Sequence, residues 1–238
     1  MAAQVLKDQK IWLGGLDLTG DTNAIGVDPT VETEDNTTFG DGNRSNVGGL
    51  LAVTASIEGI ADPETADAKL FDALGVEGEP LSYGDSGDQG AVVYTMPALI
   101  GSYAPGGEIG RLFRFTASAV SRKLVRGTLM ENLTGVAATG NGTARELGAV
   151  AAAQKLYAAL HVLAVDDPGD SLTIEIESDS AAGFSTPTTR LSFSAVNAVS
   201  GVWAVPVAGP ITDTWWRVTH TVAGTSPAFA YAAILGIQ

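Results

Sequence analysis

The chain lacks cysteine altogether, so it can form neither disulfide bonds nor thiolate metal sites. It has only two histidines, whereas a zinc site usually takes about three or four His, Cys or carboxylate ligands. Long apolar runs are also missing, because no stretch approaches about eighteen uninterrupted apolar residues and the first residues hold no apolar signal core. We therefore expect a soluble, unexported protein that uses no metal or other cofactor.

Basic residues are scarce. The 238 residues include 13 Lys and Arg against 27 Asp and Glu, which gives a formal net charge of −14 at pH 7. A nucleic-acid binder needs Lys and Arg to neutralise phosphates, so tight nucleic-acid binding is disfavoured. The same charge suits ordinary solubility, or a surface past which DNA slides without sticking. Apolar residues make up 45% of the chain, enough for one large β domain or two smaller ones.

Catalytic motifs are absent as well. The Gly-Asp-Ser-Gly run at residues 84–87 looks like the nucleophile loop of trypsin-like serine proteases, but those enzymes need a histidine earlier in the chain. Here His161 and His220 both come later, so we interpret the run as a turn and each histidine as a hydrogen-bonded core or interface imidazole. The acidic segment 166–170 lacks the ligand spacing of an EF-hand loop and is also interpreted as a turn. No enzymatic activity is expected.

What is present is a patterned first half. Residues 28–49 are acidic and glycine-rich, with Phe39 almost the only large apolar side chain, which predicts a long exposed hairpin or loop. Residues 50–60 alternate between apolar and small polar side chains, as in a half-buried strand. A helix is predicted over 62–74, with Asp62 as its N-cap and Gly75 just past its end.

Strands are predicted for the rest of the chain. Two of them, over 91–102 and 111–129, precede a stretch of small residues at 136–148, where we place a boundary between domains 1–145 and 146–238. Beyond it, short alternating strands predict a sandwich or jelly-roll-like domain. Adjacent Trp215 and Trp216 must point to opposite faces, and we assign Trp216 to the core and Trp215 to the outer face.

The element order resembles a known family. A short strand with the run Ile-Trp-Leu-Gly-Gly at 11–15, the acidic stretch, the strand and the capped helix look like the tail tube proteins of long-tailed bacterial viruses, over roughly residues 10–130. The second half is similar to the C-terminal part of a group of tail proteins from the same viruses. The runs that carry this similarity are LYAALHVL at 156–163, GPITDTWWRV at 209–218 and GTSP at 224–227.

The resemblance implies a mainly β fold, with a tail-tube-type β-sandwich or barrel, one flanking α-helix and a second β-sandwich-like domain on the tube exterior. It implies six-subunit rings that stack through the long loop into a tube in the virion tail, after assembly in the host cytoplasm. The implied partners are further copies of the chain and other tail proteins, such as the tape measure, tail terminator and distal tail proteins. DNA would pass without specific binding, and no membrane is involved.

In such a stacking subunit the acidic loop is a natural partner for the basic strands of a neighbour, with charges setting register. The candidate inter-subunit contacts are Asp28, Glu32, Glu34, Asp35, Phe39, Asp41, Arg111, Arg114, Arg122, Lys123 and Arg126. A three-subunit ring of tandem repeats is disfavoured because the second half has no capped helix. The alternative function is a virion or surface β-sandwich module that recognises carbohydrate or protein through Trp215.

Overall fold

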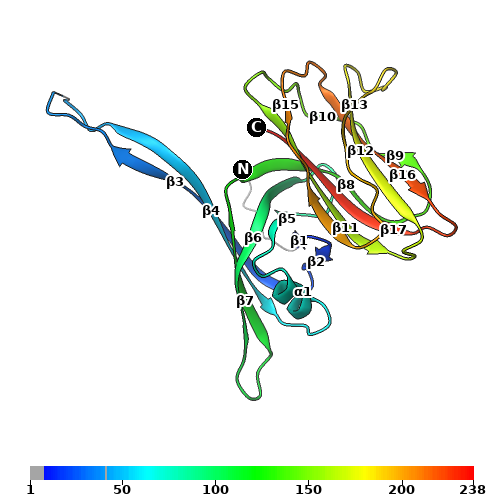
Figure 1. The fold of residues 1–238 in the computed structure, drawn as a ribbon, viewed down its shortest axis with the longest axis horizontal. Helices are drawn as coiled ribbons and strands as arrows, with labels where there is room; N and C mark the ends of the chain where they lie inside the picture. The colour runs from blue at the N-terminus through cyan, green and yellow to red at the C-terminus, as the bar shows by residue number, and fades with distance from the viewer. Residues whose placement is uncertain (1–7, 41) are drawn as a thin grey trace. The chain divides into compact units, whose positions relative to one another are not determined.

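The computed structural model describes residues 8–40 and 42–238, which form β-strands and, within these ranges, one helix (Figure 1). The predicted mainly β fold with a single helix is confirmed. Contacts divide the chain into two compact units. The larger unit takes the described residues up to Gly20, with 78–96 and 125–238, and the smaller unit takes 21–77 and 97–124.

The larger unit contains two antiparallel sheets. The long sheet has the order β14-β11-β17-β8-β6-β5-β1-β2, with β15 also paired to β11, and the short sheet has the order β10-β16-β12-β13, with β9 also paired to β16. The strands of the long sheet are β1 (Lys10–Leu13), β2 (Leu16–Asp17), β5 (Glu77–Gly84), the first part of β6 (Val92–Gly106), β8 (Val125–Val136), β11 (Lys155–Val165), β14 (Ser200–Trp203), β15 (Val207–Ala208) and β17 (Phe229–Ile237). Those of the short sheet are β9 (Gly140–Asn141), β10 (Arg145–Glu146), β12 (Ser171–Asp179), β13 (Thr188–Ser192) and β16 (Trp215–Ala223).

These two sheets enclose one apolar core, as in a β-sandwich. The long sheet contributes Leu160 and Tyr231 to it, and the short sheet contributes Ile174 and Trp216, all with no solvent exposure. The prediction that Trp216 lies in the core is confirmed, and its indole Nε1 donates a hydrogen bond to the Gly148 carbonyl at 2.8 Å. This hydrogen bond satisfies the one polar atom of the indole, so the ring can be buried without an unpaired donor.

The predicted boundary between residues 145 and 146 lies inside the larger unit. Strand β8 pairs along β17 from Thr128–Leu235 to Val136–Phe229, although the two strands lie on opposite sides of that boundary in the sequence. Met130 of β8 belongs to the sandwich core. The contacts therefore divide the chain differently from the predicted ranges 1–145 and 146–238, because non-local strand pairing joins the two ranges.

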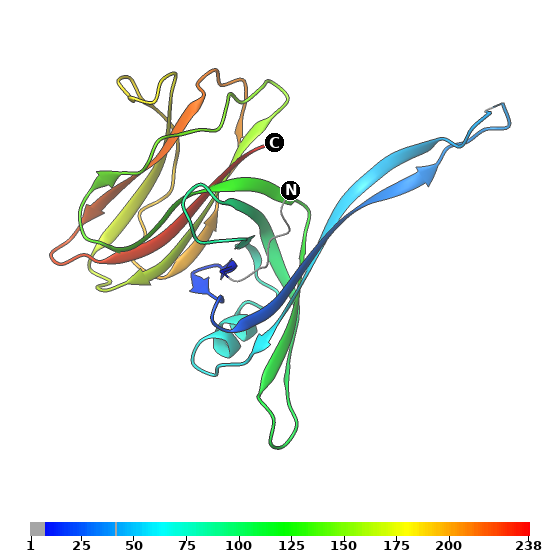
Figure 2. The same cartoon turned by 180° about the vertical axis from the view of Figure 1, so that it is seen from behind.

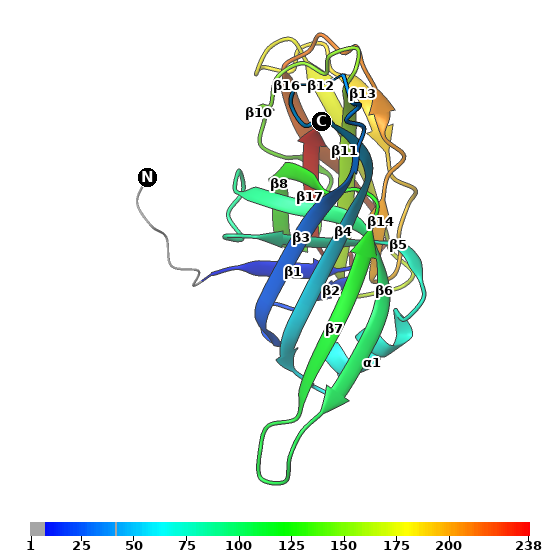
Figure 3. The same cartoon turned by 90° about the vertical axis from the view of Figure 1, so that its left-hand side faces the viewer.

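The smaller unit is a four-stranded antiparallel sheet with one helix. Its strands are β3 (Thr22–Asp35), β4 (Asn46–Ile60), β7 (Arg114–Ser121) and the second part of β6, in the order β3-β4-β7-β6 (Figure 3). Helix α1 (Ala66–Asp72) buries Ala66 and Leu70, while the sheet buries Ile57 and Phe115. The Gly75 amide donates to the Ile100 carbonyl at 3.0 Å, which ties the end of the helix to β6.

The helix is shorter than predicted, and Asp62 is not its N-cap. The Asp62 carboxylate accepts the Glu64 amide at 2.8 Å, and the Asp62 carbonyl accepts the amides of Thr65 and Asp67. The chain thus closes an Asx-type turn over 62–65, and the helix begins only at Ala66. Gly75 follows the helix with φ +75°, in the left-handed conformation expected of a glycine past a helix end.

Candidate assembly surfaces

The acidic segment forms a long hairpin arm. Strands β3 and β4 pair as far as Asp35–Asn46, whereas β7 accompanies β4 only as far as Val53. Beyond Val53, β3 and β4 have only each other as strand partners within the described part of the chain, and we call residues 30–40 and 42–52 the distal arm (Figures 1 and 2). The sequence predicted an exposed hairpin or loop here, and the structure shows a hairpin.

Apolar side chains on the distal arm are exposed. The exposed fraction is 114% for Phe39, 78% for Leu50 and 53% for Val31. Val31 pairs with Leu51, and these two side chains form an apolar stripe that continues the sheet face that buries Ile57 in the body of the unit. Leu50 precedes Leu51 on β4 and lies on the opposite face. The stripe is a core-type surface that no other described residue of the chain covers.

The predicted acidic contacts lie on the same hairpin. Glu32 and Glu34 are exposed on the distal arm, and Asp28 is exposed on β3 next to it. Asp35 forms an ion pair with Arg44 at 3.1 Å, and hydrogen bonds from Thr37 hold the pKa of its carboxyl below the usual value. Asp41 lies outside the described residues. Asp35 is therefore engaged within its own hairpin, whereas Asp28, Glu32 and Glu34 face solvent.

The other end of the same sheet carries the loop between β6 and β7. Ile109 in this loop has an exposed fraction of 106%, and Leu112 and Phe113 have 58% and 46%. A surface cavity of about 480 Å³ opens at the loop. It is lined by Gly107, Glu108, Gly110, Arg111, Leu112 and Arg114. We call residues 107–114 the loop site, and it combines exposed apolar side chains with two guanidinium groups.

The predicted basic residues do not form one patch. Arg111 and Arg114 belong to the loop site, whereas Arg122 and Lys123 lie in the turn after β7, at the opposite end of that strand. Arg126 is exposed on β8 in the larger unit. Arg114 is the first residue of the eight-residue strand β7, and Arg122 and Lys123 follow its last residue. Of the five basic residues, only Arg111 and Arg114 can therefore act together in the loop site.

The sheet face opposite α1 carries mostly polar and small side chains, with Val120 and Leu99 as apolar exceptions. Three rows cross its four strands: Asp28-Thr54-Val120-Leu99, Gly26-Ser56-Ser118-Ser102 and Ala24-Glu58-Thr116-Ala104. The hydroxyls of Ser102 and Ser118 hydrogen bond at 2.6 Å. These three rows contain hydroxyls and two carboxylates, and the next row on this face, Ile60-Arg114-Gly106, adds one guanidinium. We call this surface the open face. The alternation within residues 50–60 predicts that β4 has two different faces, but the rows across the sheet depend on the register of four strands, which the sequence of one strand does not specify.

The sequence predicts that Trp215 is exposed on the outer face, and in the structure its side chain is partly buried. It begins β16 and pairs with Asp179 and Glu146 on either side. On the same face, Arg217 forms an ion pair with Glu177 at 2.7 Å, and its guanidinium lies 4.4 Å from the centre of the Phe184 ring. Arg217 and Glu177, on the same face as Trp215, are thus already paired with each other within the chain.

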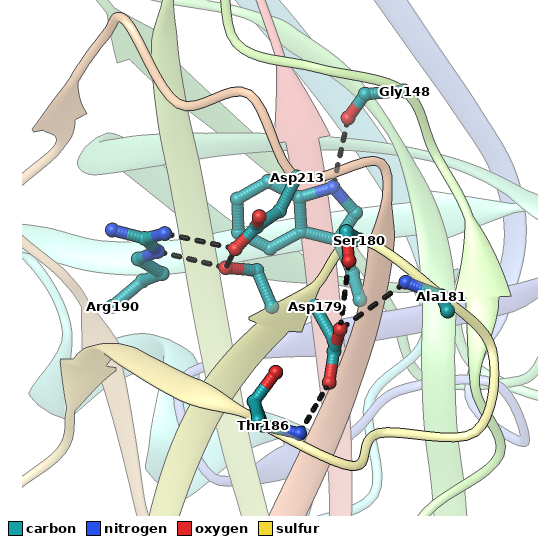
Figure 4. A network of polar contacts seen from close by, with 9 residues as sticks. Gly148, Asp179, Ser180, Ala181, Thr186, Arg190 and Asp213 are labelled. Atoms are coloured by element: carbon teal, nitrogen blue, oxygen red, sulfur yellow. Dashed lines mark hydrogen bonds and ion pairs between the residues drawn. The ribbon is translucent and has the colours of Figure 1, made fainter.

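A polar network beside β16 is also satisfied internally (Figure 4). Asp213 accepts hydrogen bonds from the Ser178 hydroxyl at 2.7 Å and from Arg190 at 2.9 Å, which hold the pKa of its carboxyl below the usual value. The backbone amide of Thr186 lowers the pKa of Asp179 in the same way. These carboxylates fix β13 and the loop that precedes it, which is a structural role.

Both histidines are core imidazoles, as predicted. His161 is fully buried, with Nδ1 2.7 Å from the Gly14 carbonyl and Nε2 2.8 Å from the Ser82 hydroxyl. Burial lowers its pKa to about 4. The Tyr231 hydroxyl lies 3.1 Å from Nδ1 of His220, whose pKa is also lowered by burial.

The interpretations of the two other motifs as turns are confirmed. In the 84–87 run the Ser86 hydroxyl accepts the Asp88 amide at 3.2 Å, and in the acidic turn the Asp167 carboxylate accepts the Gly169 amide at 2.8 Å. The described residues contain no group of three or more metal-ligating side chains. The helix in the described ranges is too short to cross a membrane.

Comparisons with known proteins give partial similarities. No protein-family model and no curated protein matches the chain. Several solved structures match it in part, and three of them are as follows. One is a chain in the virion of a native gene transfer agent particle, with 21% identity and a TM-score of 0.41, over 52% of this chain and 98% of that one. Another belongs to the sheath–tube complex of PVC, an extracellular contractile injection system, with 10% identity and a TM-score of 0.44, over 53% and 92%.

The third is the SPP1 Dit protein, described as a paradigm of the hub adsorption apparatus in phages that infect Gram-positive bacteria. It is 10% identical with a TM-score of 0.39, over 98% of this chain and 100% of that one. Because every TM-score is below 0.5, these likenesses do not assign the chain to a family.

Proposed function

We propose that this chain is a structural, non-enzymatic protein of a bacterial virus tail, and that it polymerises into stacked rings that form the tube through which viral DNA passes. The distal arm is the observation that carries this proposal. An isolated two-stranded ribbon is marginally stable in water, and exposed apolar stripes of this kind mark interaction sites. The arm therefore needs a partner, and a second copy of the chain is the partner that polymerisation supplies.

The edge of the smaller unit supports ring formation. Strand β3 has β4 as its single strand partner in the described residues, so its outer backbone groups are open to pairing. Joining the sheets of neighbouring subunits would remove this edge and close a continuous wall. In the proposal six subunits form each ring, and the sandwich of the C-terminal half lies on the tube exterior. Tape measure, tail terminator and distal tail proteins would be further partners.

The open face suits the inner wall of such a tube. DNA passes freely only along a surface that does not neutralise its phosphates, and the three rows of the open face hold Asp28, Glu58 and hydroxyls without a base. These three rows offer the polyanion no ion pairs, and the basic side chain of Arg114 stands only in the row at the end of the face. The acidic surplus of the whole chain has the same sign.

Negative-stain microscopy of the concentrated protein tests the proposal. Wild type should form rings or tubes, and deletion of residues 33–46 should leave a folded, soluble subunit that does not. Leu50→Asp on the arm should also prevent polymerisation. Its control is Val205→Asp, because Val205 is equally apolar, has an exposed fraction of 86%, and belongs to the larger unit.

Monomeric particles alone, at every concentration, would contradict the proposal. They would instead favour the alternative of a β-sandwich binding module for carbohydrate or protein. Normal tubes from the deletion variant would show that the arm is not the assembly element.

A further inference from the structure

We infer that His161 is a latch that holds residues 10–17, the strands β1 and β2, against the other end of the long sheet. We call residues 10–17 the strap. When the latch is lost, the strap detaches while the sandwich core stays folded. The inference does not depend on the proposed function, because it concerns the larger unit of a single chain.

The long sheet curls until its two ends meet without strand pairing. Its end strands are β14 and β2, and the described residues show no pairing between them. The two backbones touch instead, since a Cβ on Gly201 would lie 2.4 Å from the Cα of Gly14. In the same way, a Cβ on Gly15 would lie 2.5 Å from the amide nitrogen of Ser200. Glycine permits this close approach, but the junction lacks the hydrogen-bond ladder of a paired strand.

His161 bridges this junction. It lies on β11, where it pairs with Gly201 of β14, and its Nδ1 is 2.7 Å from the Gly14 carbonyl in the strap. Its Nε2 is 2.8 Å from the Ser82 hydroxyl on β5, which lies 2.7 Å from the hydroxyl of Thr95 on β6. One imidazole thus joins strands from both ends of the sheet. The hydroxyls complete its hydrogen bonds in a fully buried position.

The strap is the wall of this site that should move first. Strands β8, β11 and β17 are anchored on their opposite faces, where Met130, Leu160 and Tyr231 belong to the sandwich core. The strap instead contributes Trp12 to a smaller apolar cluster inside the curled sheet, and the sandwich core includes none of its described residues. A segment at the end of a sheet with fewer apolar contacts opens at a lower free energy than a core strand.

Acid should release the latch. Burial disfavours the charged imidazole and is the main cause that lowers the pKa of His161. Protonation becomes favourable when the ring reaches water, and displacement of the strap opens that path. The neutral ring therefore keeps the latch closed at neutral pH, and the strap should open as the pH falls towards 4.

Two carboxylates lie near the ring. Asp17 on β2 favours the charged imidazole and lies 3.9 Å from the ammonium group of Lys10 on β1. The carboxylate of Glu79 on β5 lies against the backbone of Gly14, 2.7 Å from the position of a Cβ there. The neighbours of the network on β6, β14 and β17 are uncharged, and they are Thr95, Gly201 and Ala232. Because the carboxylates remain in every variant, a change of the imidazole alone isolates the latch.

Fluorine NMR of the full chain labelled with fluorotryptophan tests the release of the strap. The labelled rings include Trp12 on the strap, Trp216 in the sandwich core and the partly exposed Trp215. A neutral, soluble gadolinium chelate broadens the signals of exposed rings. As the pH falls from neutral towards 4, the Trp12 signal should become as broad as that of Trp215, while the Trp216 signal stays sharp.

Three variants test the role of the imidazole. His161→Gln should abolish the separate Trp12 step, because glutamine does not titrate. His220→Gln is the matched control and should keep the step, since it changes the other buried histidine, whose partner Tyr231 belongs to the sandwich core. Ser82→Ala removes the hydrogen-bond donor to Nε2 and should move the step upwards by roughly half to one pH unit.

Exposure of Trp12 and Trp216 at the same pH would show that the unit unfolds as a whole, and it would overturn the inference. A Trp12 step that survives in His161→Gln would exclude His161 as the latch. Should His161→Gln fail to fold, the ring signals of His161 in wild type must titrate together with the Trp12 step, and separate midpoints would count against the latch. None of these outcomes bears on tube formation.

Discussion

The free energy of unfolding should fall at acidic pH because the imidazole of His161 is buried in its neutral form. The Gly14 carbonyl can only accept, so Nδ1 of His161 carries the proton and Nε2 accepts from the Ser82 hydroxyl. Ser82 in turn lies 2.7 Å from the hydroxyl of Thr95. Protonation of Nε2 would direct a second imidazole N–H at the Ser82 hydroxyl, which now donates to that nitrogen. It would also place a positive charge in a fully buried position. Burial is the main reason that the pKa of His161 falls to about 4.

The sign and size of the effect follow from linkage. The folded-state pKa of about 4 lies below the ordinary value of 6.5, so the unfolded chain binds more protons between these two values. The contribution of the neutral imidazole is complete above pH 6.5 and is lost as the pH falls towards 4. With about 1.4 kcal/mol for each pKa unit, the loss reaches roughly 3 kcal/mol.

Urea unfolding of wild type and His161→Gln at pH 7.5 and pH 4.5 measures this loss. Glutamine does not titrate, and the carboxylates contribute equally to both proteins, so wild type should lose about 2.5 kcal/mol more than the variant between the two pH values. The ring signals of His161 in an NMR titration should have a midpoint near 4 rather than 6.5. Identical pH dependence in the two proteins would refute the assignment of a neutral buried imidazole.

Three further changes test the packing. Trp216→Ala should lower the free energy of unfolding by about 3–5 kcal/mol, since it empties a fully buried site, and Trp215→Ala should cost clearly less because that ring is partly exposed; a similar loss in both would contradict the assigned faces. Gly201→Ala should cost about 1–3 kcal/mol, because its Cβ would lie 2.4 Å from backbone of the β1–β2 turn, whereas Gly183→Ala meets open space and should leave the melting temperature unchanged. A fragment of residues 146–238 should show no cooperative melt by circular dichroism, because it lacks β8; a cooperative melt would show that the fragment has a complete core.

Local pattern alone determined much of this protein. Alternation assigned the faces of β4 and β16 and placed Trp216 in the core, because side chains along a strand point to opposite faces whatever their partners. Turn chemistry identified the 84–87 run and the glycine after the helix. Composition identified the acidic hairpin, because it has too few apolar residues to pack a core.

The tertiary structure decided the rest, because each remaining feature depends on residues far apart in the sequence. Pairing of β8 with β17 placed the unit boundary away from residue 145. The basic residues that lie close together in the sequence are far apart in space, because Arg111 and Arg114 lie at the start of β7 and Arg122 follows its end. The rows of the open face exist only once the register of four strands is set, and Asp28 meets Thr54 there through backbone hydrogen bonds that neither segment specifies alone.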